Sequence, residues 1–274
     1  MMADNYLEKK FEEHLNSASR PVTRRHLPVK ERRAVVTGGA KGIGAAIVRS
    51  LRVAGHKVAF CDIDEAAGAD TALRTGAEFF CVDVADADAF RSFLRGVESR
   101  WGGVDIIVNN VAVKQPAPLL EATVEQFDRA MAVDVRPVLI GAQEMARMRS
   151  VVTDGERPYG RIVNICSSRQ RQSLPGNDIH AAAKGAIFSL THSLAISLSA
   201  YGVTVNSISP GMIATADYDN VPPAIHAQHP SGRVGRPDDV ARLIRFLIDE
   251  ANDFVNAENI VVDGGLTRKM AFVP

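Results

Sequence analysis

Short runs of β-branched and other apolar residues alternate with longer segments of helical pattern, from residue 33 almost to the end of the chain. Such runs are typical of strands that are buried on both faces of a sheet. Most connections between them are long enough to hold a helix, so neighbouring strands are expected to be parallel. The pattern predicts an α/β fold, a doubly wound Rossmann-type parallel sheet with helices on both faces. The predicted strands lie at residues 34–37, 58–61, 78–82, 106–108, 162–165, 203–208 and 259–262.

The domain organisation is interpreted as a polar N-terminal arm, residues 1–32, followed by a single domain, residues 33–274. A loose apolar stripe predicts a short helix at residues 5–15, and residues 20–28 are expected to form an extended linker. We interpret the arm as a segment that packs on a neighbouring subunit or frays. A specific binding role is the alternative. The sequence contains no internal repeat of the 20–50-residue kind.

Composition excludes several classes of protein. Formal charge is balanced, with 32 basic and 32 acidic residues, which argues against a nucleic-acid or polyanion binder. No apolar run approaches the roughly 20 residues that a membrane-spanning helix needs. The N-terminal residues show no hydrophobic signal segment. The odd number of cysteines, Cys61, Cys81 and Cys166, all in strand-like stretches, predicts buried free thiols and a cytoplasmic protein.

A glycine-rich turn connects the first predicted strand to a helix that runs to Val53. It reads Thr37-Gly38-Gly39-Ala40-Lys41-Gly42-Ile43-Gly44. Glycines allow the backbone to turn sharply and to approach a pyrophosphate, and a helix N-terminus presents amide groups and a partial positive charge to it. Position between a strand and a helix is the context that distinguishes a dinucleotide site from an ordinary turn.

The second predicted strand ends at Asp62, where a carboxylate can accept both hydroxyls of the adenosine ribose and repels a 2′-phosphate. Asp64 is interpreted as a solvent-facing helix cap. Lys41, in the glycine turn, favours a 2′-phosphate and so argues in the other direction. Because Asp62 is followed by Ile63 and not by a basic residue, NAD is expected, with NADP less favoured.

Further motifs follow in order, and together they resemble the short-chain dehydrogenase/reductase family from Arg33 to about Arg268. They are Asp83-Val84, Asn109-Asn110-Val111-Ala112, Pro210-Gly211-Met212-Ile213-x-Thr215, Gly232 to Val240, and Val262-Asp263-Gly264-Gly265. The resemblance implies a nicotinamide coenzyme held by Thr37, Gly38, Lys41, Gly42, Ile43, Gly44, Asp62, Ile63, Asp83, Val84, Asn110, Val111, Lys184, Pro210, Gly211, Ile213 and Thr215.

The catalytic positions of that family are partly changed. Carried over by spacing, the family's serine is Ser167 and its lysine is Lys184, but its tyrosine position holds His180 and its asparagine position holds Asp134. In the family the tyrosine exchanges a proton with the substrate oxygen, the lysine lowers the tyrosine pKa and binds the ribose, and the serine holds the oxygen. Spacing of four residues places His180 and Lys184 on one helix face.

Three interpretations of His180 stay open. In the first, it is a working acid/base, with an unperturbed pKa near 6.5 that suits proton transfer, and Asp134 offsets the charge of Lys184. In the second, the site is impaired and the protein binds NAD as a sensor or assembly subunit. In the third, histidine is an introduced change at a position where the parent enzyme carries tyrosine.

Basic residues border the expected nicotinamide position and are substrate candidates: Lys114, Arg169 and Arg171. They favour a carboxylate, hence a small hydroxy, oxo or sugar acid, although a solvated loop or subunit contact explains them equally well. A neutral polyol or cyclic alcohol stays open. Residues 213–235 are expected to form a substrate lid, and His226 and His229 within it are not expected to bind a metal.

The resemblance also implies a homotetramer, with a dimer as the next possibility. Two helices, expected at residues 124–148 and 181–200, resemble the pair that forms the four-helix interface of tetrameric relatives. The sequence therefore predicts an NAD-dependent oxidoreductase that interconverts a secondary alcohol and a ketone on a small-molecule substrate. No nucleic-acid or membrane partner is expected.

Overall fold

The computed structural model describes residues 30–149 and 159–270, and residues from Glu31 onward belong to one compact unit. The helix expected at residues 5–15 and nearly all of the N-terminal arm lie outside the described residues.

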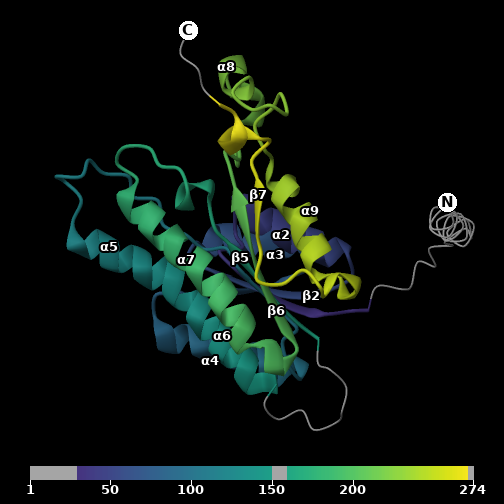
Figure 1. Cartoon of the computed structure of the whole chain (residues 1–274). Helices are drawn as coiled ribbons and strands as arrows, with labels where there is room; N and C mark the ends of the chain where they lie inside the picture. The colour runs from purple at the N-terminus through teal and green to yellow at the C-terminus, as the bar shows by residue number, and fades with distance from the viewer. Residues whose placement is uncertain (1–29, 150–158, 271–274) are drawn as a thin grey trace, which may run out of the picture. The chain divides into compact units, whose positions relative to one another are not determined.

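The centre of this unit is a parallel sheet in the order β3-β2-β1-β4-β5-β6-β7 (Figure 1). Strand order reverses between β1 and β4, so the chain winds outward in two directions from this point, as in dinucleotide-binding folds. Every run predicted to be a strand is one, and the predicted fold class is confirmed. The strands are β1 Arg33–Thr37, β2 Lys57–Asp62, β3 Glu78–Cys81, β4 Ile106–Asn109, β5 Gly160–Ile165, β6 Val203–Pro210 and β7 Asn259–Val262.

Helices cover both faces of the sheet because alternate strand residues point in opposite directions. Val35 and Ile107 belong to the core under α4, α6 and α7, whereas Val36 and Val108 belong to the core under α2 and α9. The helices are α2 Gly42–Val53, α3 Glu65–Thr75, α4 Ala87–Trp101, α5 Val124–Ala130, α6 Arg136–Arg149, α7 Asp178–Ser197, the short α8 Pro223–His226, and α9 Pro237–Ile248. None of the helices in the described ranges is long and apolar enough to cross a membrane.

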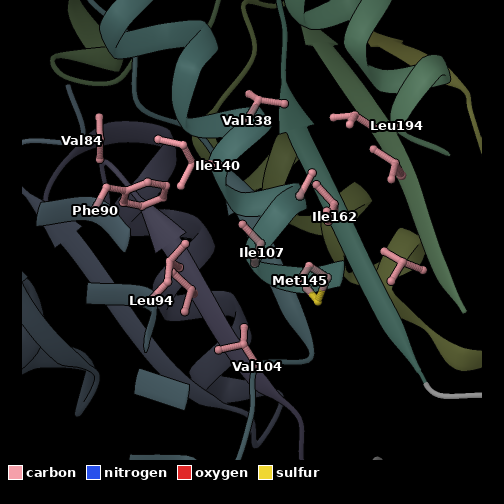
Figure 2. Packing of buried hydrophobic residues seen from close by; sticks show 14 of the residues in the cluster. Val84, Phe90, Leu94, Val104, Ile107, Val138, Ile140, Met145, Ile162 and Leu194 are labelled. Atoms are coloured by element: carbon pink, nitrogen blue, oxygen red, sulfur yellow. The ribbon is translucent and has the colours of Figure 1, made fainter. Parts of the chain in front are cut away.

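The first of these cores is packed from the strands outward. Figure 2 shows Phe90 of α4 close to Ile140 of α6, with Leu94 of α4 and Ile107 of β4 in the same cluster. These side chains are almost completely buried, and each contributes roughly 1.5–3 kcal/mol by leaving water. The core fixes α4, α6 and α7 on the sheet and so positions the residues at their ends.

One predicted helix is interrupted. The segment expected as a continuous helix at residues 124–148 contains a π-helical turn, Met131–Val135, between α5 and α6. Pro137 explains the break, because it has no N–H and its ring conflicts with the carbonyl four residues earlier. The Arg136 N–H instead donates to the Met131 carbonyl, five residues back. The turn contains Asp134, which makes it a functional candidate.

The cysteine prediction needs one correction. All three thiols are free, and Cys61 and Cys166 are buried as predicted, but Cys81 is exposed. Cys81 is the last residue of β3, an edge strand with a neighbour on only one side.

A buried carboxylate joins α4 to α6. The Glu144 side chain is 2% exposed and forms ion pairs with Arg91 at 3.0 Å, Arg95 at 2.9 Å and Arg147 at 2.8 Å. Burial raises the pKa of Glu144, but hydrogen bonds from the three guanidinium groups outweigh it and lower the pKa to about 2.

We predict that Glu144→Gln lowers the free energy of unfolding by about 1–2 kcal/mol at pH 7, because a neutral amide replaces the negative charge that three arginines share. Because the pKa of Glu144 is lower in the folded state than in the unfolded state, its ion pairs stabilise the fold fully at pH values above the unfolded pKa of about 4.5. This stabilisation is lost as the pH falls toward the folded-state pKa of about 2. The native chain should therefore lose more stability than the variant between those values. Urea unfolding at pH 7 and pH 3 measures this. Exposed Glu121→Gln is the control, and equal acid sensitivity in native chain and Glu144 variant would contradict the prediction.

Candidate active site

The glycine turn after β1 forms a cradle for a phosphate group. Gly38 and Gly42 have positive φ values of 65° and 55°, which L side chains rarely adopt. A Cβ on Gly44 would collide with the carbonyl oxygen of Gly38. Since α2 begins at Gly42, its free amide groups point from the same place. The residues present therefore fit the pyrophosphate of a dinucleotide.

Thr37 and Asn110 hold this turn against the end of β4. The Asn110 side-chain amide donates to the carbonyls of Thr37 at 3.1 Å and Gly38 at 2.9 Å. The Thr37 hydroxyl accepts from the backbone amides of Asn110 at 3.0 Å and Val111 at 3.2 Å. Thr37 is fully buried, so it supports the cradle from behind and does not line the cavity.

Asp62 lies at the end of β2, beside the cradle. Its carboxylate accepts from the backbone amides of Ala40 at 3.0 Å and Asp64 at 3.1 Å, which fixes its orientation. Lys41 forms an ion pair with Asp64, which also caps α3 as expected by accepting from Ala67. The lysine that favours a 2′-phosphate is therefore engaged by a neighbouring carboxylate, whose pKa it lowers.

An arginine that the sequence analysis missed lies beside Asp83 in the same cavity. Arg129 lines the cavity and pairs with Asp83 at 3.0 Å, while Asp83 also accepts from Ala85. Burial raises the pKa of Asp83, and these hydrogen bonds outweigh it. No local sequence signal connects Arg129 to Asp83, because only the packing of α5 beside the end of β3 brings them together.

Lys184 carries a buried ammonium group at the other end of the site. Its Nζ donates to the Ile165 carbonyl at 3.1 Å and lies 3.4 Å from an Asp134 oxygen. The second Asp134 oxygen accepts from the Val113 amide at 2.8 Å. Burial raises the pKa of Asp134, and Lys184 partly offsets that rise. An ammonium group has three donors and the hydrogen bond to Ile165 uses one, so donor capacity remains for a cofactor hydroxyl.

His180 lies one turn before Lys184 on α7 and lines the cavity. Its Nδ1 is buried and has no hydrogen-bond partner among the described residues. Burial is the largest cause that lowers the pKa of His180, and together with the positive charges of Lys184, Lys114 and Arg169 it brings the pKa to about 4. The pKa of His180 is therefore well below the unperturbed value near 6.5 that the sequence analysis assumed. The ring is neutral at pH 7 and can accept a proton.

Ser167 follows β5 and lines the same cavity. Its hydroxyl accepts from the Arg169 amide at 3.1 Å. Ser168 lines a different, smaller hollow, so of the two serines Ser167 is the one in the cavity. Cys166 also lines the cavity and was not anticipated; burial raises the pKa of its thiol, which keeps it an unreactive wall residue.

These groups share one cavity of about 410 Å³. Gly42 and Asp134 lie outside its lining, and a Cβ on Gly42 would lie only 3.1 Å from the Thr215 side chain. The sequence-predicted residues that line it are Gly38, Lys41, Ile43, Gly44, Asp62, Ile63, Asp83, Val84, Asn110, Val111, Lys114, Ser167, His180, Lys184, Pro210, Gly211, Ile213 and Thr215.

The three residues proposed to bind substrate lie in different surroundings in the structure. Lys114 lines the cavity, whereas Arg169 acts on His180 through its charge from outside the lining. Arg171 lies over the Phe188 ring at 5.6 Å and borders a separate hollow of about 150 Å³ together with Arg268.

The expected lid contains ordered contacts. His226 accepts from the Val234 amide at 3.1 Å, and the ring of His229 bonds the Ile225 carbonyl at 3.1 Å. These histidines bind the lid's own backbone. Within the described ranges, no three His, Cys, Asp or Glu residues come together in a group that could hold a metal ion.

Comparison with known proteins gives the family. The family model described as Enoyl-(Acyl carrier protein) reductase matches residues 38–267. An uncharacterized oxidoreductase of Thermotoga maritima is 40% identical, over 87% of this chain and 97% of that protein. A sorbitol dehydrogenase of Cereibacter sphaeroides is 33% identical over 85% of this chain and 96% of its own length.

Solved structures agree. An apo SCOR enzyme from Clostridium thermocellum superposes with a TM-score of 0.77 and 34% identity, covering 88% of this chain and 95% of that one. A Serratia marcescens short-chain dehydrogenase/reductase mutant gives a TM-score of 0.78 at 30% identity, over 88% and 100% of the two chains. The chain belongs to the short-chain dehydrogenase/reductase family of oxidoreductases.

We predict that Gly44→Ala abolishes nicotinamide coenzyme binding, because its methyl group cannot fit beside the Gly38 carbonyl. The matched control is Gly96→Ala in α4, where an added Cβ meets nothing within 4 Å and should stabilise the helix by about 0.5–1 kcal/mol. NADH fluorescence titration and thermal unfolding measure both effects. Normal NADH affinity in the Gly44 variant would contradict the cradle.

Proposed function

We propose that the protein is an NAD-dependent oxidoreductase that interconverts a secondary alcohol and a ketone on a small polar substrate. The observation that carries the proposal is the shared cavity, with the glycine cradle and Asp62 at one end and Ser167, His180 and Lys184 at the other. The relatives named as dehydrogenases of polyols and sugar acids support the reaction class, among them a gluconate 5-dehydrogenase of Gluconobacter oxydans that is 31% identical.

The preference for NAD rests on Asp62 and Lys41. Asp62 is held by two backbone amides in the place where it would meet the ribose hydroxyls, and its charge would repel a 2′-phosphate. Lys41, the residue that would attract that phosphate, is paired with Asp64.

The residues divide the work of alcohol oxidation. The coenzyme, when bound, supplies the acceptor for the hydride that leaves the carbinol carbon. Ser167 holds the substrate oxygen by a hydrogen bond, and neutral His180 accepts the hydroxyl proton. Lys184 offers its remaining N–H to the coenzyme ribose. Asp134 compensates the lysine charge, so the site can bury the ammonium next to an imidazole.

The alternative is an NAD-binding family member without turnover. The buried, unpartnered Nδ1 of His180 favours it, because a catalytic imidazole is usually oriented by a partner on the ring nitrogen that does not react, and Nδ1 has none among the described residues. We also propose a cytoplasmic homotetramer. Its support is the set of free thiols and the exposed apolar side chains Phe127, Leu139 and Ile196 on α5, α6 and α7.

The test is NADH formation from a panel of polyols, sugar acids and hydroxy acids by the native chain and by His180→Tyr. We expect turnover by the native chain, with kcat/KM at least about tenfold higher for NAD⁺ than for NADP⁺, and a smaller preference in Asp62→Ser. Asp70→Ser, on the exposed side of α3, is the control. Turnover only in the tyrosine variant would show a disabled site, and NAD binding without turnover in either would favour the alternative.

A further inference from the structure

Positive charge dominates the surroundings of His180. Lys184 lies on the same helix, Lys114 follows β4, and Arg169 lies in the 3₁₀ turn after Ser167; all three lower the pKa of His180. The nearest carboxylates do not balance them. Asp134, on the π turn, is paired with Lys184. Asp178 is exposed and lies two residues before His180 on α7, a spacing that does not place two side chains on one helix face.

Two of these cations lack a carboxylate. In the part of the chain that the structure describes, Lys114 and Arg169 form no ion pair, whereas Lys184 does. Lys114 also lines the catalytic cavity next to Ser167 and His180. A pocket with an unpaired lysine in its lining, a second unpaired cation just outside it and a neutral base is suited to receive an anion.

We propose that the substrate carries a carboxylate that binds at Lys114, within the field of Arg169, and that this bound anion activates His180 as the base. The inference rests on the proposed function and narrows its substrate to hydroxy acids. The carboxylate supplies the negative charge that the protein itself does not place beside the imidazole.

The physical consequence is a coupling between substrate recognition and proton transfer. An anion within about 4–6 Å of an imidazole favours its protonated form and raises its pKa by roughly one unit or more. His180 then becomes a stronger base when the correct substrate is bound. The alcohol proton moves to His180 and the hydride to NAD⁺, so the oxidation yields an oxo acid, NADH and one proton. A neutral polyol would reach the same atoms without this activation.

The experiment compares acids with neutral molecules that carry the same carbinol. Suitable pairs are gluconate and sorbitol, 3-hydroxybutyrate and 3-hydroxybutyramide, and 4-hydroxycyclohexanecarboxylate and its carboxamide. In any pair that the enzyme oxidises, we expect kcat/KM with NAD⁺ to be at least about tenfold higher for the acid than for its neutral partner. Lys114→Gln should remove this advantage, so that the acid and its neutral partner are oxidised with similar kcat/KM. Lys57→Gln, at the opposite end of the strands, is the matched control and should change neither.

A pH profile separates activation of His180 from simple binding. The profile of kcat/KM reports the free enzyme and that of kcat reports the substrate complex. For an acid substrate, the acid limb of kcat should lie about one pH unit above that of kcat/KM, and Lys114→Gln should reduce this difference.

The possible outcomes distinguish failure of the carboxylate site from failure of the proposed function. Equal kcat/KM for acid and neutral partners, or an acid preference that survives Lys114→Gln, overturns the carboxylate site and leaves the proposed function standing. Turnover of no alcohol by either the native chain or His180→Tyr overturns the proposed function and this inference with it.

Discussion

The buried ion pair between Lys184 and Asp134 is the constraint on which the catalytic end of this structure depends. An ammonium group that is 3% exposed is strongly destabilising unless acceptors surround it. The Ile165 carbonyl supplies one acceptor and Asp134 supplies charge. Asp134 lies in the π turn that Pro137 imposes, so the irregular backbone carries the carboxylate that pairs with the buried lysine. An asparagine there would leave the ammonium with a neutral neighbour.

The pair connects the two departures from the family's catalytic pattern. A tyrosine at position 180 would depend on the full charge of Lys184 to lower its phenol pKa, and Asp134 would weaken that help. A histidine has the opposite requirement, since the lysine charge pushes its pKa down and a carboxylate paired with that lysine would limit this effect. Asp134 and His180 are therefore compatible with each other. This favours a site in which imidazole is the working base over one in which histidine was introduced alone.

Most of the fold was predictable because buried parallel strands leave a strong, uniform apolar signal, and all seven runs became strands. The glycine turn and the spacing of Ser167, His180 and Lys184 were equally local, and the structure brings them into one cavity. Features that depend on packing were missed. The pairing of Arg129 with Asp83 joins distant segments, the low pKa of His180 comes from burial, and the π turn depends on how Pro137 interrupts the hydrogen bonds of a helix. Arg171 was chosen by proximity in sequence, but the 3₁₀ turn after Ser167 directs it to another hollow.

The central claim is that a buried imidazole, neutral at physiological pH, accepts the substrate proton. The pH dependence of kcat/KM for alcohol oxidation tests it most directly, with recovery of activity at pH 7 as the control for acid unfolding. A base must be unprotonated to act, so we expect a plateau through neutral pH and loss of activity only as pH falls toward the His180 pKa of about 4. His180→Tyr should show a different profile. An acid limb near pH 6.5 or above in the native chain, or the same profile in both proteins, would contradict the account.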